Sequence, residues 1–288
     1  MNSEYFKWRK MKSRDITRVE DLLFNVEDDY VGACGRFLER VESRDTIWLL
    51  CGKKDEISAL VINSKSTVIP VFCRKFCNTH GNKEVPDIKK LAGLLKKKRI
   101  YSLQGIKNEV IILEDILRQI GAKVSDTIDY DLMTIDKQLV FKGSSPGNLT
   151  LCVPQMTDLD ALAPLQAAYE QEEVLPKGSA FSPAASRVNI ANLIAKGYVF
   201  AARLDGRFVG KINISAVSFT RYQVGGVYVH PDYRGMGIAR AMAGEFIALL
   251  VGKGRGVTLF VKKNNAAACR LYAGLGFITR NDYRITYY

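Results

Sequence analysis

The stretch Val227–Ala239 constrains the fold of this chain most, because it joins a strand to a helix through two glycines. An apolar run ends at His230, and from Gly237 onward apolar residues recur every four positions, as they do on one face of a helix. The first amides of such a helix have no internal partners and face outward at the positive end of its dipole. Gly235 and Gly237 let a pyrophosphate approach them, although a glycine pair alone is also typical of a simple turn.

The length of 288 residues suits two domains better than one. Turn-forming residues collect at Lys142–Asn148, between two strand-like stretches, which is the composition of an interdomain linker. We therefore predict domains at residues 1–143 and 144–288.

Helices and strands alternate in the second domain. Ser182 and Pro183 predict the start of a helix that Gly197 ends, and Asp205-Gly206 predicts a hairpin turn. The expected order is β-α-α-β-β-β-α-β-α-β, with strands near 149–153, 198–204, 208–215, 223–230, 257–261 and 278–288. This order predicts the α/β class, with a mixed sheet of the α+β kind.

The first half repeats parts of this plan. Residues 49–64 align without gaps with 200–215, and 129–135 resemble 282–287, so the sequence favours a duplicated domain. No glycine-rich turn separates the expected strand at 67–73 from the expected helix at 87–97. We therefore expect the first domain to lack a phosphate-binding turn and to have no cofactor-binding role.

Composition narrows the range of partners. No apolar stretch approaches the roughly 20 residues that cross a bilayer, and residues 1–18 lack the apolar centre of a secretory signal, so we expect a cytoplasmic protein without a membrane span. The six cysteines form no dense disulfide framework. A formal charge of +12 suits nucleic acid, a membrane surface or a small polyanion such as coenzyme A.

Two motifs resemble those of the GCN5-related N-acetyltransferase (GNAT) family. Arg234-x-x-Gly237-x-Ala239 fits the family's pattern of Gln or Arg, two residues, Gly, one residue, and Gly or Ala, after the expected strand. A second pattern follows in the right order at Asn265, Ala268, Leu271, Tyr272, Gly276 and Phe277. The resemblance covers roughly residues 149–288 and, together with the internal repeat, implies two tandem GNAT-like modules.

The resemblance also implies a cofactor site. Acetyl-CoA would lie where the fourth and fifth strands of the second domain splay apart, with the pantetheine arm on Val227 and Val229 and the pyrophosphate on residues 234–239. Asn265 would touch the cofactor from another side. The residues expected at the cofactor are Val227, Tyr228, Val229, Arg234, Gly235, Met236, Gly237, Ile238, Ala239 and Asn265.

For catalysis, the resemblance implies direct attack of a primary amine on the thioester, with Tyr272 as the acid that assists the departing thiolate. The alternative for Tyr272 is a tyrosine that packs one face of a short helix. An amine with a pKa near 10.4 is neutral in less than about one molecule in a thousand at pH 7, so a base or a water chain must deprotonate it. Glu173, with Glu170 and Glu172, is a candidate for that role or for binding a cationic amine, and a solvated acidic turn is the equal alternative.

Other features carry less weight. His230 lies in a His-Pro turn typical of the family's strand end. Cys73, Cys77 and His80 supply three zinc ligands where a structural site needs four, so we expect no metal. The run Lys96–Arg99 is more typical of a solvated helix end than of a nucleic-acid contact.

Two rivals to the acetyltransferase hypothesis remain open. Tandem modules of this fold also act as aminoacyl transferases that use aminoacyl-tRNA, and the intact pyrophosphate turn disfavours that reading. A sensor or adaptor that binds acetyl-CoA without catalysis is the second rival, and the presence of Tyr272 weighs against it. The sequence leaves the amine acceptor, the general base and the oligomeric state undetermined.

Overall fold

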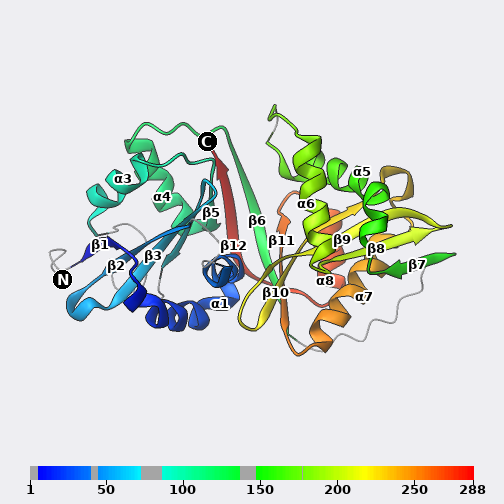
Figure 1. Cartoon of the computed structure of the whole chain (residues 1–288), viewed down its shortest axis with the longest axis horizontal. Helices are drawn as coiled ribbons and strands as arrows, with labels where there is room; N and C mark the ends of the chain where they lie inside the picture. Colours follow the sequence, from blue (N-terminus) through cyan, green and yellow to red (C-terminus); the bar gives the residue numbers. More distant parts are fainter. Residues whose placement is uncertain (1–5, 40–44, 73–85, 137–146, 177) are drawn as a thin grey trace. The chain divides into compact units, whose positions relative to one another are not determined.

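The computed structural model describes residues 6–39, 45–72, 86–136, 147–176 and 178–288. Both halves of the chain show nearly the same succession of elements (Figure 1). The first half contains β1 (Lys7–Lys10), α1 (Ile16–Leu38), β2 (Thr46–Cys51), β3 (Ile57–Ser64), β4 (Thr67–Phe72), α3 (Ile88–Lys96), β5 (Ser102–Ile106), α4 (Lys107–Gln119) and β6 (Asp126–Ile135). The second contains β7 (Leu149–Cys152), α5 (Leu159–Tyr169), the π-helix η7 (Glu170–Val174), α6 (Pro183–Ala195), β8 (Val199–Leu204), β9 (Arg207–Val217), β10 (Arg221–Val229), the 3-10 helix η8 (Pro231–Tyr233), α7 (Ile238–Gly252), β11 (Gly256–Lys262), α8 (Ala266–Gly274) and β12 (Ile278–Tyr287).

The expected order of elements in the second half is confirmed, and local chemistry explains its boundaries. Ser182 caps α6 by accepting a hydrogen bond from the Ala185 amide (3.3 Å). Asp205 and Gly206 both have positive φ, as a two-residue turn between strands of normal twist requires, and β8 and β9 pair on either side of them. None of the described helices is both long and apolar enough to cross a membrane.

Two compact units divide the chain, and each takes segments from both halves. Unit 1 is Met1–Leu132 with Lys262–Asn264 and Arg280–Tyr288, and unit 2 is Met133–Val261 with Asn265–Thr279. Within unit 1 the strand order is β1-β2-β3-β4-β5-β12-β6, and β12 is antiparallel to β5. Within unit 2 the order is β6-β11-β10-β9-β8-β7. The predicted boundary at 143/144 lies outside the described residues and stays a prediction.

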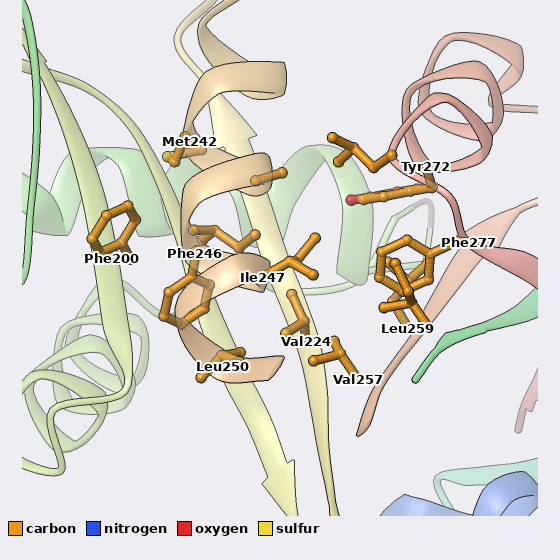
Figure 2. Close-up of a cluster of buried hydrophobic side chains, with 14 of the residues drawn as sticks. Phe200, Val224, Met242, Phe246, Ile247, Leu250, Val257, Leu259, Tyr272 and Phe277 are labelled. Atoms are coloured by element: carbon orange, nitrogen blue, oxygen red, sulfur yellow. The ribbon is translucent and has the colours of Figure 1, made fainter. Parts of the chain in front are cut away.

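The sheet of unit 2 has a core on each face, because successive residues of a strand point to opposite sides. Phe200 and Ile212 join α7 in one cluster, where Phe200 stacks on Phe246 (Figure 2). Ala201 and Tyr228 join α5 and α6 in the other. Unit 1 has its own core around the two tryptophans of the chain, Trp8 and Trp48, which are 0% and 3% exposed, and the helices α3 and α4.

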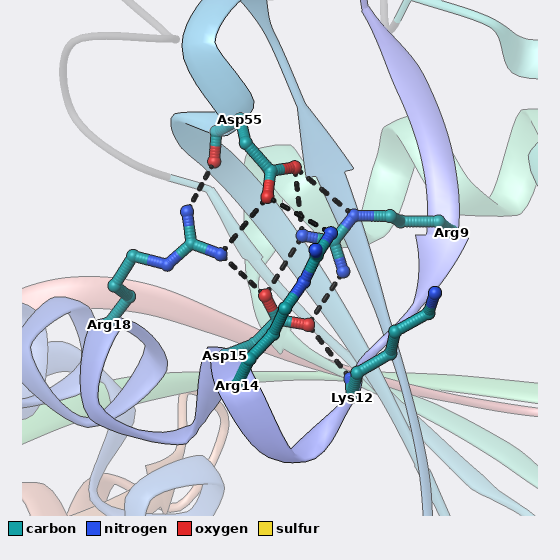
Figure 3. A network of polar contacts seen from close by, with 6 residues as sticks. All are labelled: Arg9, Lys12, Arg14, Asp15, Arg18 and Asp55. Carbon is teal, nitrogen blue, oxygen red and sulfur yellow. Dashed lines mark hydrogen bonds and ion pairs between the residues drawn. The ribbon is translucent and has the colours of Figure 1, made fainter.

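A network of ionic contacts holds the edge of unit 1 (Figure 3). The side chain of Asp15 is fully buried, and it receives hydrogen bonds from Arg9 (2.6 Å), Arg18 (2.6 Å) and the amide of Lys12 (2.8 Å). Asp55, which is 38% exposed, bonds the same two arginines. The Arg9 guanidinium holds the pKa of Asp15 well below its usual range. Asp15 therefore stabilises unit 1 above about pH 4, and this contribution is lost as the pH falls below that value.

Replacing Asp15 with Ala is expected to lower the free energy of unfolding of unit 1 by about 3 kcal/mol, because two arginines lose a buried partner. Urea denaturation followed by tryptophan fluorescence at pH 7 measures this, since both tryptophans lie in unit 1. The matched variant Asp55→Ala removes an exposed carboxylate from the same arginines and should cost clearly less. Equal losses in the two variants would contradict the assignment of Asp15 as the centre of the network.

Candidate active site

The parallel ladder between β10 and β11 ends early. The two strands are in register for four residues, from Arg221↔Gly256 to Val224↔Leu259, and residues 225–229 of β10 have no register partner in β11. On its other edge β10 stays paired with β9 as far as Val229. The fourth and fifth strands of this half thus separate after Val224, just before Val227, Tyr228 and Val229, which the sequence analysis predicts to lie at the cofactor.

A β-bulge shapes the unpaired part of β10. Gly225 pairs with Asn213 and Tyr228 pairs with Lys211, so β10 has one residue more than β9 between these two pairs. Gly226 lies in this bulge with a φ of +62°, and a Cβ there would lie 1.8 Å from Asn213 Oδ1. The position therefore requires glycine, both for its backbone angle and for space.

Lys211 lies beneath this bulge and is 0% exposed. Its Nζ donates to the carbonyl oxygen of Gly226 (2.8 Å) and to Asn213 Oδ1 (3.2 Å), and it lies 4.4 Å from the centre of the Tyr169 ring. Burial lowers the pKa of Lys211 to about 7, and the charge of Glu170 opposes that shift. The ammonium group thus changes its charge near neutral pH.

The helix α7 begins at the glycine turn. Gly237 is its N-cap residue with a φ of +78°, and no side chain caps the first turn. Gly235 also has a positive φ, and nothing lies within 4 Å of a Cβ built at either glycine. Gly235, Met236 and Gly237 are exposed, whereas Ile238 is buried and Ala239 is partly buried. The first amides of α7 accordingly present an open site suited to an anion.

Arg234 links this turn to η7. Its Nε donates to the carbonyl of Val229 (3.0 Å), and its Nη2 donates to Glu172 (2.8 Å). The hydroxyl of Tyr228 donates to the other oxygen of Glu172 (2.5 Å). Burial and the Glu172 carboxylate raise the pKa of Tyr228 to about 12, and the bonds from Tyr228 and Arg234 lower the pKa of Glu172. Glu172 thus ties the acidic turn to the strand and to the glycine turn.

Tyr272 lies in α8, is 6% exposed and packs edge-on against Phe277. Figure 2 shows its hydroxyl directed away from α8, toward α7. Burial, and then the charges of Tyr169 and Glu173, raise the pKa of Tyr272. The group therefore stays a phenol at neutral pH, which suits a hydrogen-bond donor rather than an acid that gives up its proton completely.

The acidic helix η7 carries Glu170, Glu172 and Glu173, the three carboxylates considered in the sequence analysis. Glu170 accepts hydrogen bonds from Gln166 (2.8 Å) and Asn189 (3.1 Å), and Glu173 is partly buried and acts electrostatically on both Tyr169 and Tyr272. The carboxylates of Glu170 and Glu172 thus have partners within the protein, and the choice between a base and a solvated acidic turn stays a prediction. Glu173 keeps its place as a candidate base, and Glu172 has a structural bond network.

The predicted site residue Asn265 and the residue His230, to which the sequence analysis gave little weight, both take capping positions. Asn265 Oδ1 accepts a hydrogen bond from the Ala268 amide (3.0 Å) and so caps α8. The ring of His230 accepts a hydrogen bond from the Asp232 amide (3.4 Å) in η8. The residues Cys73, Cys77 and His80 lie outside the described part of the chain, and within that part no group of three or more potential metal ligands is found.

Sequence reasoning missed Lys211 and the bonds of Glu172. Lys211 follows a glycine in a hairpin strand, where a lysine usually faces solvent. The one hint was Asn213, two residues along, because residues two apart in a strand share a face and both of these are polar. The partners of Glu172 are 56 and 62 residues away in the chain, so no local pattern reveals them.

Comparison with known proteins gives these observations a context. Residues 165–277 match the model of the acetyltransferase (GNAT) family. Solved structures with similar folds include a Drosophila protein (12% identity, TM-score 0.69, 98% of both chains) and a GCN5-related N-acetyltransferase from Sphaerobacter thermophilus (19%, 0.61, 98% of this chain and 94% of that one). A tandem GNAT protein from the clavulanic acid biosynthesis pathway is also similar (14%, 0.61, 98% and 97%). A comparison with curated protein sequences finds no match.

The buried ammonium predicts a pH-dependent stability. Folded Lys211 loses its proton near pH 7 and the unfolded side chain near 10.5, so the unfolded state binds more protons between these values and stability rises with pH there. Relative to Lys211→Met, the parent protein should therefore gain about 3 kcal/mol between pH 6 and pH 9. Thermal and urea unfolding followed by circular dichroism at both pH values measures the difference.

Lys196→Met is the matched control, because Lys196 also lies over a tyrosine ring, 5.8 Å from that of Tyr198, but is exposed. Its stability relative to the parent should not depend on pH. The same pH dependence in both variants would show that the effect does not come from the buried amine.

Proposed function

Residues 165–277 form a domain of the GNAT acetyltransferase family, and from that premise we propose that the chain moves an acetyl group from acetyl-CoA to a primary amine. One observation carries the proposal: the uncapped first turn of α7 lies open at Gly235 and Gly237, directly after the part of β10 that β11 leaves unpaired. A cofactor with a pyrophosphate and a long amide-bearing arm needs both features: the helix start would bind the pyrophosphate, and the strand edge would bind the amides of the arm.

The residues present fit that cofactor. The amides that follow Gly237 would donate hydrogen bonds to the pyrophosphate, and the positive charge of the chain favours such a ligand. Main-chain groups of Val227 and Val229, on the unpaired edge, would bond the pantetheine amides. Asn265 would contribute through its place at the start of α8. Acetyl-CoA supplies the activated acyl group, and no metal is required.

The proposed chemistry is direct transfer. After losing one proton, the amine nitrogen attacks the thioester carbonyl, the carbon–sulfur bond breaks, and coenzyme A leaves as a thiolate. The second proton, which the nitrogen gives up as it becomes an amide, ends on the sulfur and yields the thiol. Main-chain N–H groups of the unpaired β10 segment would stabilise the oxyanion, and Tyr272 would donate a hydrogen bond to the departing sulfur. Glu173, on the turn that acts electrostatically on Tyr272, is proposed to take the proton directly or through water.

For the first half of the chain we propose a GNAT-like module without catalysis. Its strands β4 and β5 are parallel and in register for only two residues, Thr67↔Ser102 and Val68↔Leu103, so they separate as β10 and β11 do. Beyond that point the amide of Phe72 donates to the buried carboxyl of Glu109 (3.3 Å), which also accepts a hydrogen bond from Tyr30. A side chain of the module thus uses a main-chain donor that a cofactor would need.

Acetyl-CoA binding tests the proposal first. At 1,000 times its dissociation constant the ligand should add about 4.1 kcal/mol to the free energy of unfolding, which raises the melting temperature. Gly237→Glu should abolish this shift, because the new side chain brings bulk and negative charge to the phosphate site. Differential scanning fluorimetry with and without excess acetyl-CoA makes the measurement.

Gly254→Glu is the matched control. Gly254 has nearly the same backbone angle (φ +77° against +78°) and the same open surroundings, but it lies beyond the far end of α7. Both variants should lose similar intrinsic stability, and only Gly237→Glu should lose the shift. A parent protein that folds well and shows no shift would overturn the acetyl-CoA premise.

Tyr272→Phe tests the chemical step. The change should lower kcat by about 10- to 100-fold and leave the affinity for acetyl-CoA nearly intact, because the hydroxyl acts on charge that develops only in the transition state. Thiol release is measured with the amine that reacts fastest in a panel of small amines, peptides and polyamines. Tyr222→Phe, the same change at the paired start of β10, should keep full turnover. An undiminished kcat in Tyr272→Phe would remove the acid from the mechanism.

A further inference from the structure

We infer that Lys211 is a positioning residue for the acyl group: through the Gly226 carbonyl it sets the direction in which the Val227 amide points at the thioester oxygen. The inference rests on the proposed function, because it assigns a role within that site. Lys211 is fully buried, and no motif of the sequence singles it out.

The geometry of one peptide group carries the inference. The carbonyl of Gly226 and the N–H of Val227 belong to the same planar unit and point in opposite directions. Lys211 Nζ holds the carbonyl at 2.8 Å, and Asn213 holds Nζ at 3.2 Å from its side-chain oxygen. The peptide group between Gly226 and Val227 is therefore held from the α5 face, where Lys211 Nζ also lies 4.4 Å from the centre of the Tyr169 ring.

This segment needs such support. Gly226 and Val227 have no register partner in β9 and none in β11. Glycine in addition allows more backbone conformations than any other residue. Without the bond from Lys211, the peptide group between Gly226 and Val227 would be held only through its paired neighbours Gly225 and Tyr228, and an oxyanion donor stabilises charge best when its direction is set before the reaction.

The charge on Lys211 adds a second effect. A donor on the carbonyl oxygen polarises the whole peptide group and strengthens its N–H as a donor, and a charged donor does so more than a neutral one. The titratable groups that face Lys211 are Tyr169 from α5, Glu170 from η7 and Tyr228 from β10. Burial among them places the pKa of Lys211 at about 7, so the polarisation should change near neutral pH. A neutral donor would support the bulge without the cost of burying an amine.

The test reads the thioester carbonyl itself and needs no acceptor. Isotope-edited infrared difference spectra are recorded for [1-¹³C]acetyl-CoA bound to the full chain between pH 6 and pH 9, with free acetyl-CoA as reference. In the parent protein the carbonyl band of the bound ligand should lie below that of the free ligand at pH 6. It should move back toward the free position with a midpoint near pH 7. In Lys211→Met the displacement should be smaller and independent of pH, and in Lys196→Met it should match the parent.

Each outcome decides a different point. A bound band that does not titrate in the parent, or that titrates equally in Lys211→Met, overturns the role of Lys211 and leaves the proposed function standing. Absence of any bound band in a folded parent protein overturns the proposed function and the inference with it. If Lys211→Met does not fold, the parent titration alone decides, because a flat profile from pH 6 to pH 9 contradicts the inference.

Discussion

The early end of the β10–β11 ladder is the constraint on which the rest of unit 2 depends. A strand that loses its neighbour must satisfy its main-chain donors and acceptors in some other way, because a buried amide without a partner is costly. In this unit the bulge at Gly226 turns one peptide toward Lys211, and the segment that follows is left with groups for a ligand. The glycine turn before α7 follows that segment after the short helix η8, so the uncapped helix start and the strand edge that β11 leaves unpaired lie close together in the sequence.

The same constraint is met differently in unit 1. There the parallel ladder of β4 and β5 ends after two residues, but the Phe72 amide is bonded to Glu109, whose carboxyl has a pKa raised to about 8 by burial. One oxygen of this carboxyl accepts from both Tyr30 and the main-chain amide of Phe72. In unit 1 a side chain of the protein itself thus bonds a main-chain group in the gap between the separated strands. In unit 2 the corresponding strand has no register partner in β11 after Val224.

The sequence was informative where the signal is local. The helical period from Ile238, the hairpin at Asp205-Gly206 and the cap at Ser182 each depend on neighbours within a few residues, and the structure confirms these elements. The place of β12, the last strand of the chain, beside β5 of unit 1 could not be predicted from such local signals. β12 pairs with β5, whose residues are about 180 positions earlier, and a strand pattern of period two says only that a strand exists, not which edge it joins.

The residues of the candidate site also differ in whether local sequence signals could predict them. The positive φ and the open surroundings of Gly235 and Gly237 could be expected from the glycine spacing, because both depend on the local backbone alone. Lys211 could not, because its burial comes from Tyr169, 42 residues earlier, and from the bulge at Gly226. Arg234 shows the limit most directly: the motif assigns it to the cofactor, yet its guanidinium also holds Val229 and Glu172. Arg234 is thus both a motif residue and the link that joins the glycine turn to the acidic turn, so a ligand phosphate that draws on its charge would act on the position of Glu172 as well.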